Sequence, residues 1–355
     1  MESNLCVFIL THGRPNNVIT YNTIRKSGYN GQVFLVIDNE DETADQYRSK
    51  FGAENVIMFD KAKTARNFDE FDNFEDRRTI VYARNECFKI AKRLGYEYFL
   101  ELDDDYTKFG FRSCTIEDYN FYGSWVSINS TLELVFNATL EFYKAISAKS
   151  IAFSQGGDWM QKFAGDLAFS RRKCMNTFFC ATSRPFDFVG RINEDVNTYT
   201  WYQSQGNLFL TIPLIQVCQK QTQHNAGGMT DIYLNQGTYI KSFYSIICSP
   251  SCVSIRIMGS TNRRMHHKVN WDCAVPMLID EKHRKATEVV APKLKVLPMV
   301  TLPPKESVTI GNAPKKTLPP PKKKEIKPEK NFDIDNYWKD RGFCGSIKLT
   351  DSITL

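Results

Sequence analysis

Residues 97–106 read EYFLELDDDY, an apolar run that ends in three consecutive aspartates. The stretch EYFLEL has the length and apolar composition of a buried β-strand. Adjacent carboxylates repel one another, and a cation placed between them relieves that repulsion. Asp103, Asp104 and Asp105 could therefore form a cation-binding site or a solvated loop, and the residues around them indicate which.

Strands and helices alternate along the chain before this run. Apolar stretches predict strands, and amphipathic stretches predict helices. In chain order these elements are strand 5–10, helix 18–28, strand 32–38, helix 43–52, strand 55–60 and helix 79–95. This alternation predicts an α/β fold with a doubly wound, mostly parallel sheet. Ligands bind at the carboxyl ends of the strands in such a sheet, and the aspartates fall at one of these ends.

Positive charge is concentrated in one segment of the 355-residue chain. The net charge is +6, but residues 291–330 hold ten lysines against three glutamates, so the rest of the chain sums to −1. Nine prolines in this segment exclude a helix or a central strand there. We therefore predict a folded domain at 1–290, a disordered Lys/Pro-rich linker at 291–330 and a C-terminal peptide at 331–355. The lysines either attract DNA phosphates or are simply solvated.

The sequence predicts a cytoplasmic protein. No run of about 18 apolar residues is present, so no transmembrane helix is expected. The apolar run near the N-terminus lacks a basic region and a cleavage site, and we interpret it as a strand and not as a signal peptide. Ten cysteines are scattered without a CxxC pair, which predicts free thiols in a reducing compartment.

Two of the three aspartates are candidate metal ligands. If the chain stays extended after the strand, side-chain alternation puts Asp103 and Asp105 on the same side. Carboxylates and substrate phosphates are the ligands that Mg²⁺ or Mn²⁺ prefers. A solvated acidic loop and a helix N-cap are the alternative interpretations.

The motifs around this strand resemble those of GT-A glycosyltransferases. The first half of the likeness consists of LTHGRP, FLVIDNED and YARNECFKIAKRLGYEYFLELDDDY. Further along, TYIKSFYS, PSCVSI and RRMHHKVNW narrow the resemblance to the TET-associated glycosyltransferases, which are encoded largely by bacteriophages. The likeness covers approximately residues 5–285. It implies a GT-A fold and transfer of a sugar from a nucleotide-sugar, with a UDP-sugar expected, to a hydroxymethylated pyrimidine in DNA, with cytosine as the first expectation.

The resemblance implies a set of donor-binding residues near the ends of the first strands. The loop after the first strand, Thr11, His12, Gly13 and Arg14, would contact the nucleotide. Asp38, which closes 32–38, would accept a hydrogen bond from the ribose or base, and Arg84 would support the diphosphate. Asp104 is a further candidate for donor binding. A strand-ending turn, a loop carboxylate and a surface salt bridge are the alternatives.

The C-terminal motif RRMHHKVNW would complete the donor site. His266 or His267 would join Asp103 and Asp105 on Mn²⁺ or Mg²⁺, with His224 as the second choice of histidine. Lys268, assisted by Arg263 or Arg264, would stabilise the leaving diphosphate. A basic patch for the DNA backbone is the competing interpretation of this motif.

Acceptor chemistry is implied for the acidic pair in GRINEDVNTY, residues 190–199. Asp195, next to Glu194, would deprotonate the acceptor hydroxyl, which requires a carboxylate within hydrogen-bond reach. The helix macrodipole alone also favours such a pair at a helix start. In SQGGDW, Asp158 would accept sugar hydroxyls and Trp159 would stack on a ring, or the segment is a tight turn.

Several functions stay open at the level of the sequence. The same fold could act on a glycan, on a protein or on a sugar already attached to DNA. A nucleotidyltransferase and a non-enzymatic DNA-binding module belong to other classes. The donor sugar, the metal, the anomeric outcome, the base and the oligomeric state are not decided by these residues.

Overall fold

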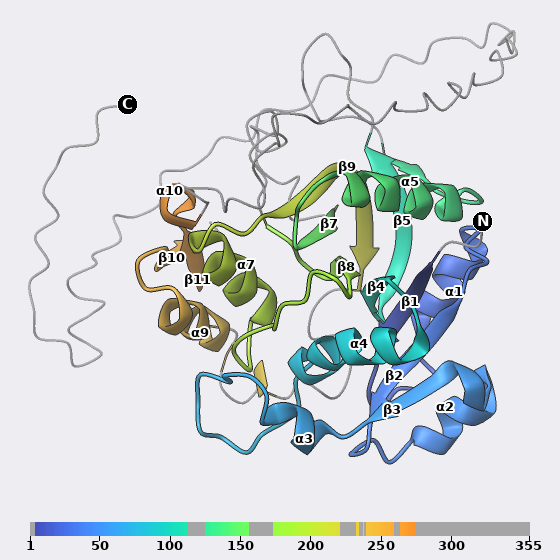
Figure 1. The fold of residues 1–355 in the computed structure, drawn as a ribbon. Helices are drawn as coiled ribbons and strands as arrows, with labels where there is room; N and C mark the ends of the chain where they lie inside the picture. The colour runs from blue at the N-terminus through green and yellow to red at the C-terminus, as the bar shows by residue number, and fades with distance from the viewer. Residues whose placement is uncertain are drawn as a thin grey trace, which may run out of the picture. The chain divides into compact units, whose positions relative to one another are not determined.

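The computed structural model describes residues 4–112, 125–155, 173–220, 232–233, 237, 239–258 and 263–274, whose arrangement is shown in Figure 1. They form a nine-stranded sheet in the order β3-β2-β1-β4-β8-β7-β9-β5-β6, and a separate two-stranded sheet of β10 and β11. The strands are β1 (Leu5–Leu10), β2 (Val33–Asp38), β3 (Val56–Phe59), β4 (Tyr98–Asp103), β5 (Tyr106–Arg112), β6 (Trp125–Ser127), β7 (Ser150–Gln155), β8 (Thr177–Ala181), β9 (Phe209–Gln219), β10 (Val253–Met258) and β11 (Arg264–Val269). The helices are α1 (Ile19–Lys26), α2 (Ala44–Phe51), α3 (Lys61–Ala65), α4 (Val81–Leu94), α5 (Leu132–Ala145), α7 (Glu194–Ser204), α9 (Ile240–Cys248) and α10 (Trp271–Ala274), with a 3-10 turn η1 (Ala53–Asn55).

The predicted α/β class is confirmed, and the first four strands of the sheet are parallel. β1 pairs in parallel with both β2 and β4, and β2 pairs in parallel with β3. Beyond β4 the sheet is mixed, since β8 is antiparallel to β4 and β7, while β5 is antiparallel to β9. The carboxyl ends of β1, β2 and β4 therefore meet at one edge, where Thr11, Asp38 and Asp103 follow or end the strands.

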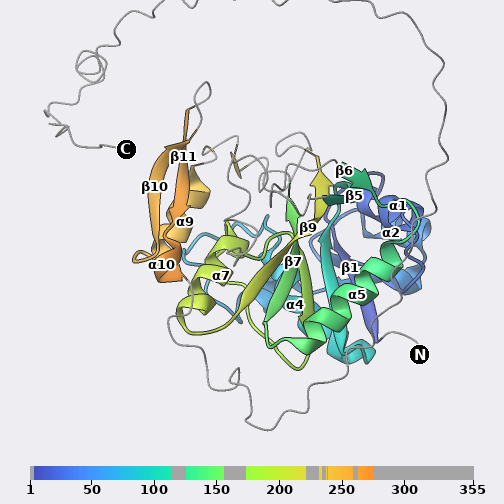
Figure 2. The same ribbon diagram turned by 90° about the horizontal axis from the view of Figure 1, so that it is seen from above.

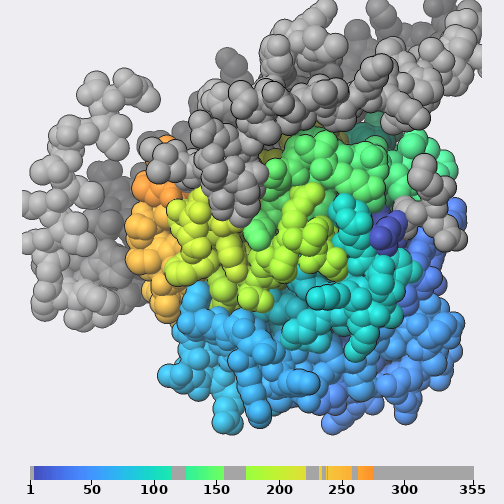
Figure 3. Space-filling view, in the orientation of Figure 1, coloured from blue at the N-terminus to red at the C-terminus, as the bar shows by residue number. Residues whose placement is uncertain are grey.

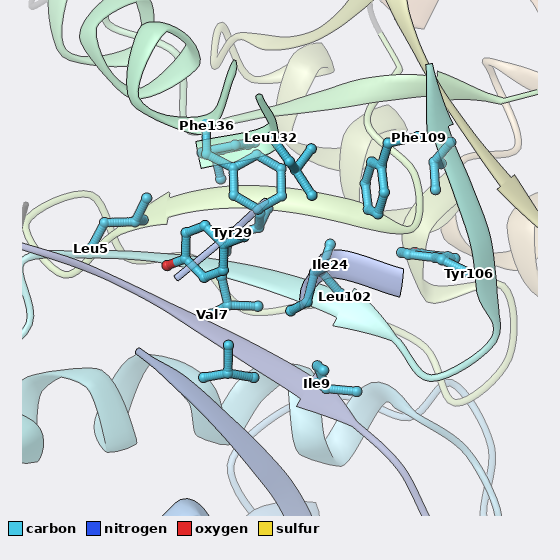
Figure 4. Packing of buried hydrophobic residues seen from close by; sticks show 14 of the residues in the cluster. Leu5, Val7, Ile9, Ile24, Tyr29, Leu102, Tyr106, Phe109, Leu132 and Phe136 are labelled. Carbon is cyan, nitrogen blue, oxygen red and sulfur yellow. The ribbon is translucent and has the colours of Figure 1, made fainter. Parts of the chain in front are cut away.

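Helices cover both faces of the sheet (Figures 1 and 2). Side chains alternate along a strand, so Val7 of β1 joins one hydrophobic core and Phe8 joins the other. The first core is completed by α1 and α5, whose Ile24, Leu132 and Phe136 point toward the strands in Figure 4. The second core is completed by α4 and α7. Burial on both faces explains why β1 and β2 are apolar along nearly their whole length.

The three aspartates lie at a turn. β4 ends at Asp103, Asp104 and Asp105 form the turn, and β5 begins at Tyr106. Thr20 of α1 is fully buried and holds this turn, because its Oγ1 donates to the Asp103 carbonyl oxygen (2.6 Å) and accepts from the Tyr106 N–H (2.9 Å). The chain is therefore not extended after β4, which the alternation argument for Asp103 and Asp105 required. The turn, and not strand alternation, sets the position of Asp105 relative to Asp103.

The hairpin of β10 and β11 lies with α9 and α10 beside α7 (Figure 2). Trp271 of α10 stacks on Tyr199 of α7, with ring centroids 5.8 Å apart. A small core of Cys252, Val253 and Ala274 joins the hairpin to α10. In the space-filling view of Figure 3 the orange segment abuts the yellow-green α7 region. These contacts attach the hairpin to the helix that begins with Glu194.

The described residues all belong to the first of two compact units, Met1–Val289 and Val290–Leu355. The predicted linker and C-terminal peptide lie outside the described residues, so the domain division stays a prediction. Within the described ranges, none of the helices has the length and apolar character needed to cross a membrane. The eight cysteines in these ranges are free thiols.

We expect Thr20→Val to lower the free energy of unfolding by about 1–3 kcal/mol, because it leaves the buried Tyr106 N–H and Asp103 carbonyl without this partner. Urea unfolding measures the change. Thr23→Val is the matched control on the same helix, since the Thr23 hydroxyl makes no hydrogen bond among the described residues, and it should change stability by under about 0.5 kcal/mol. Equal losses in the two variants would show that the Thr20 hydroxyl does not hold the turn.

Candidate active site

Arg84 of α4 joins three carboxylates at the carboxyl edge of the sheet. Its side chain is 1% exposed. Its Nη2 donates to Asp103 Oδ1 (2.8 Å), and its Nε donates to Glu194 Oε1 (3.0 Å). Its Nη1 lies 3.6 Å from Glu101 Oε2. One buried guanidinium therefore links the end of β4 to the start of α7.

The surroundings of Arg84 are otherwise aromatic. Its guanidinium carbon lies 4.7 Å from the ring centroid of Phe178 and 5.7 Å from that of Phe188. Glu101 is fully buried, and its two carboxylate oxygens have no hydrogen-bond partner among the described residues. Burial raises the pKa of Glu101 to about 8, although the charge of Arg84 opposes this rise. A cation at this depth needs carboxylates beside it, so the cluster is held as a unit.

Asp103 and Asp105 are the two aspartates of the turn that keep accessible surface. The Asp103 side chain is 22% exposed, and Asp105 is half-buried. Burial raises the pKa of Asp103 to about 6, with Arg84 opposing the rise and Glu194 adding to it. Burial and the charges of Asp103 and Asp104 raise the pKa of Asp105 to about 7. Carboxyl groups that oppose each other's ionisation favour a cation between them.

These two aspartates offer part of a metal site. Within the described part of the chain, no group of three or more His, Cys, Asp or Glu side chains is arranged to hold a metal ion. His266 and His267 therefore do not complete a three-residue site with Asp103 and Asp105 in this arrangement. Mg²⁺ beside a nucleotide is commonly bound by one or two carboxylates, with water and phosphate oxygens filling the other positions. Asp103 and Asp105 fit that pattern.

Asp104 has different partners and fixes the loop after β1. It is buried, and its Oδ2 accepts from Thr11 Oγ1 (2.7 Å) and lies 3.4 Å from Arg14 Nε. The Tyr47 hydroxyl contacts Thr11 Oγ1 (2.9 Å) and accepts from the Arg14 N–H (2.8 Å). The structure therefore pairs Arg14, the predicted phosphate ligand, with Asp104.

The carboxylate of Asp38, which ends β2, is engaged by its neighbours. Its Oδ2 lies 2.8 Å from His12 Nδ1 and accepts from Lys61 Nζ (3.2 Å). Burial raises the pKa of Asp38, but the His12 hydrogen bond and the Lys61 charge outweigh burial and lower the pKa below its usual value. Asp38 is 4% exposed, whereas the His12 side chain is 43% exposed. His12 is therefore the member of this pair that a ligand can reach, and Asp38 orients it.

Gly13 turns the same loop beside open space. Its φ is +67°, and a Cβ at this position would meet no atom within 4 Å. Its N–H donates to Asp41 Oδ2 (2.8 Å), and Asp41 also accepts from the Thr43 N–H and hydroxyl. A left-handed φ favours glycine. The open space beside the Gly13 backbone fits the predicted close approach of a nucleotide.

Glu194 and Asp195 begin α7, and their partners differ. Glu194 is held by Arg84. Asp195 is 8% exposed, and the one hydrogen bond that its carboxylate makes among the described residues comes from the Val196 N–H (2.7 Å). Burial and the charge of Glu194 raise the pKa of Asp195 to about 7. A carboxyl group that titrates near neutrality is suited to general-base catalysis.

Cationic and imidazole side chains lie around Asp195. The charge of Asp195 acts on Lys173 and Lys241, but burial outweighs it and lowers the pKa of both, that of Lys173 to about 8. Burial, followed by the charges of His266 and Lys241, lowers the pKa of His267 to about 3, so its imidazole is neutral. His267 Nδ1 has no hydrogen-bond partner among the described residues. The hairpin therefore brings His267 into the same electrostatic environment as Asp195.

The other predicted residues are exposed or undescribed. Lys268 is exposed on β11, as are Arg263 and Arg264 at its start. Asp158, Trp159 and His224 lie outside the described residues, so their roles stay predictions.

Five residues belong to the site without having been assigned a role from the sequence. They are Asp41, Tyr47, Lys61, Glu101 and Lys241. A signal existed for Glu101, because a glutamate inside an apolar strand needs a cationic partner and the preceding helix carries Arg84. The partners of the other four come from loops or from elements far along the chain, and no local pattern indicates them.

Comparisons with known proteins identify related sequences and folds. The sequence model of the TET-Associated Glycosyltransferase family matches residues 5–228, which is more than half of the chain. A search of curated proteins found no match.

Three similar solved structures belong to two enzymes. Glucosyl-3-phosphoglycerate synthase from Mycobacterium tuberculosis with Mn²⁺, UDP and phosphoglyceric acid has a TM-score of 0.37 and 9% identity, covering 75% of this chain and 86% of that chain. The same enzyme with Mg²⁺ and UDP has a TM-score of 0.38 and 10% identity, covering 75% and 87%. A mannosyltransferase from Pyrobaculum calidifontis with GDP-Man and Mn²⁺ has a TM-score of 0.40 and 9% identity, covering 70% and 74%. At TM-scores below 0.5 these likenesses carry no argument about activity.

We expect Arg84→Met to lower the free energy of unfolding by about 3–5 kcal/mol at pH 8, because it leaves buried carboxylates uncompensated. Burial already raises the folded-state pKa of Glu101 to about 8 and that of Asp103 to about 6, and loss of the Arg84 charge, which opposes both rises, raises the two pKa values further than in wild type. The folded state then binds more protons, so the deficit relative to wild type should shrink as the pH falls toward 5. Chemical denaturation of both proteins between pH 5 and 8 measures this stability deficit. Arg93→Met, on the exposed surface of α4, is the control, and a pH-independent deficit would contradict charge compensation by Arg84.

Proposed function

Because the chain belongs to the TET-associated glycosyltransferase family and is a glycosyltransferase, we propose that it glycosylates modified DNA. The proposed reaction moves a sugar from a nucleotide-sugar to the hydroxymethyl group of a 5-hydroxymethylpyrimidine. A UDP-sugar is the first candidate donor, and hydroxymethylcytosine is the first candidate base. A location in the cytoplasm, that of a bacterial host if the gene is phage-borne, belongs to the same proposal.

The Arg84 cluster is the observation that carries the proposal. Glycosyl transfer requires a donor diphosphate and an acceptor hydroxyl to meet at one anomeric carbon. Arg84 contacts Asp103, on the proposed donor side, and Glu194, which directly precedes the proposed base Asp195. In the proposed reaction, a single side chain would thus position the residues that serve the donor and those that serve the acceptor.

A divalent cation, Mg²⁺ or Mn²⁺, is part of the proposal. Asp103 and Asp105 would hold it, since both are carboxylates with accessible surface and neighbouring carboxylates help to raise the pKa of each. When bound, the cation neutralises negative charge on the diphosphate leaving group. The sequence also predicts that Lys268, with Arg263 or Arg264, adds positive charge to the leaving group, but these side chains are exposed and make no described contact with the aspartate turn, so the proposal does not rely on them.

On the donor side, the loop after β1 would bind the nucleotide. His12 is exposed and oriented by Asp38, and the Gly13 backbone faces open space. Arg14 is held by Asp104, which keeps its guanidinium near the aspartate turn. These contacts support the predicted roles of the loop.

On the acceptor side, Glu194 and Asp195 would have separate roles. Glu194 is fixed by Arg84 and positions the first turn of α7. Asp195 would accept the proton of the acceptor hydroxyl as that oxygen bonds to the anomeric carbon and the nucleoside diphosphate departs. Its pKa of about 7 makes it ionised over part of the physiological pH range.

The proposal is tested with four matched DNA duplexes, containing hydroxymethylcytosine, hydroxymethyluracil, a pre-glycosylated hydroxymethylpyrimidine or no modification. With a panel of nucleotide-sugars and Mn²⁺, mass spectrometry should show one added sugar on a hydroxymethylated duplex and none on the unmodified duplex. Asp103→Asn and Asp105→Asn should lose about 100-fold or more in rate, and EDTA should abolish transfer. Equal inactivity on all four duplexes, with transfer to a glycan or protein, would overturn the DNA acceptor.

We expect kcat to rise with pH up to about 7 and then to level off, because Asp195 must lose its proton before it can act as a base. Asp195→Asn should lower kcat by about 10²–10⁴-fold and remove this step from the pH profile. Single-turnover rates between pH 5 and 9 provide the measurement. Persistence of the step in Asp195→Asn would assign the titration to another group.

A further inference from the structure

We propose that the outward face of the β10–β11 hairpin binds the phosphates of the acceptor DNA. We call this surface the basic face and define it by Ser254, Arg256, Arg264, His266 and Lys268. The inference rests on the proposed DNA acceptor and goes beyond it by naming the surface that holds the duplex.

The register of the hairpin separates its two faces. Ser254 pairs with Lys268 and Arg256 pairs with His266, so these side chains project to the same side. Val253, one residue away, is buried in the small core that Val269 and Trp271 join. The base of this side therefore packs toward α9 and α10, while Ile255, Ile257 and Met265 farther along it are exposed, as are the cations of the basic face.

The basic face carries positive charge without acidic partners. Arg256, Arg264 and Lys268 are exposed, and none of them forms an ion pair with a described carboxylate. Residues 239–274 contain five lysines and arginines against one acid, Asp272. The chain outside 291–330 sums to −1, so this segment differs from the rest of the domain. Such a concentration of one sign of charge attracts a polyanion.

The opposite side of the same hairpin leads to the proposed base. His267 projects inward, where Lys241 and Lys173 act on its pKa. Asp195 acts on the pKa of both lysines. The hairpin also lies beside α7 in Figure 2, in agreement with the contacts of α9 and α10 with α7. A duplex held on the basic face would thus be separated from the side chains around Asp195 by the two strands of the hairpin.

The shape of the hairpin favours duplex DNA over a neutral acceptor. The major groove admits a two-stranded β-ribbon, and substituents at C5 of a pyrimidine project into that groove. Arginine and lysine supply most protein contacts to phosphate, and such contacts fix the register of a duplex without reading its sequence. A neutral glycan acceptor would gain no charge attraction from the three exposed cations.

The test uses the full chain with the double variant Ser254→Glu/Arg256→Glu, which changes the charge of the basic face by three units. The control Lys26→Ala/Arg93→Glu changes the net charge equally at exposed sites on α1 and α4. Fluorescence anisotropy with an unmodified duplex is measured over a range of salt concentrations. We expect the double variant to weaken binding about tenfold or more, and to reduce the slope of log K against log salt by about one for the lost arginine contact.

A kinetic measurement distinguishes a loss of DNA binding from a loss of catalysis. In the double variant the KM for a hydroxymethylated duplex should rise in parallel with the dissociation constant, while kcat at saturating DNA changes by less than about threefold. Unchanged affinity and salt slope in the double variant, or an equal loss in the control, would overturn the basic face as the binding surface. If the wild-type chain transfers no sugar to any DNA, the proposed function fails, and the anisotropy result still decides the role of the hairpin.

Discussion

The charge balance around Arg84 is the constraint on which the rest of the site depends. A guanidinium that is 1% exposed must keep carboxylates beside it, because an uncompensated buried charge is strongly destabilising. Its partners come from β4 and from the start of α7, which are far apart in the sequence. The requirement for neutrality therefore holds these two elements together. As a consequence, the proposed metal-binding aspartates, at the end of β4 and in the turn that follows it, share one rigid support with the proposed base on α7.

Electrostatics divide the site into two regions of opposite sign. The aspartate turn is acidic, and burial together with the charges of neighbouring carboxylates raises the pKa values of Asp103 and Asp105. A diphosphate can approach this turn favourably only with a cation present. The hairpin is basic and exposed, so it attracts a polyanion without a cofactor. For a transferase whose proposed donor and acceptor are both anionic, this division directs each substrate to its own side.

Local signals predicted the strands and helices of residues 5–103 well, apart from the short helix α3, but did not predict the roles of neighbouring residues. Side-chain alternation separates Asp104 from Asp103 and Asp105 in the sequence, but it does not show that Asp104 is buried against Thr11 and Arg14 while the other two stay accessible. The difference arises because the chain turns after β4, and the turn depends on a hydrogen bond from α1. In the same way, Asp38 orients His12 through a hydrogen bond, and Lys61 contacts the same carboxylate oxygen of Asp38. Contacts of this kind join separate segments and leave no mark in a local pattern.

The amino-acid sequence by itself determined the alternation of strands and helices, the burial of the parallel strands and the position of the acidic run at a strand end. These features depend on the period of apolar side chains within about ten residues, which sets what a short segment can bury. The tertiary structure alone decided which carboxylates share Arg84, that β5 pairs with β9, and that the base of the β10–β11 hairpin packs on α10. These outcomes depend on packing and charge neutralisation between segments far apart in the chain, so they exist only once the core has formed.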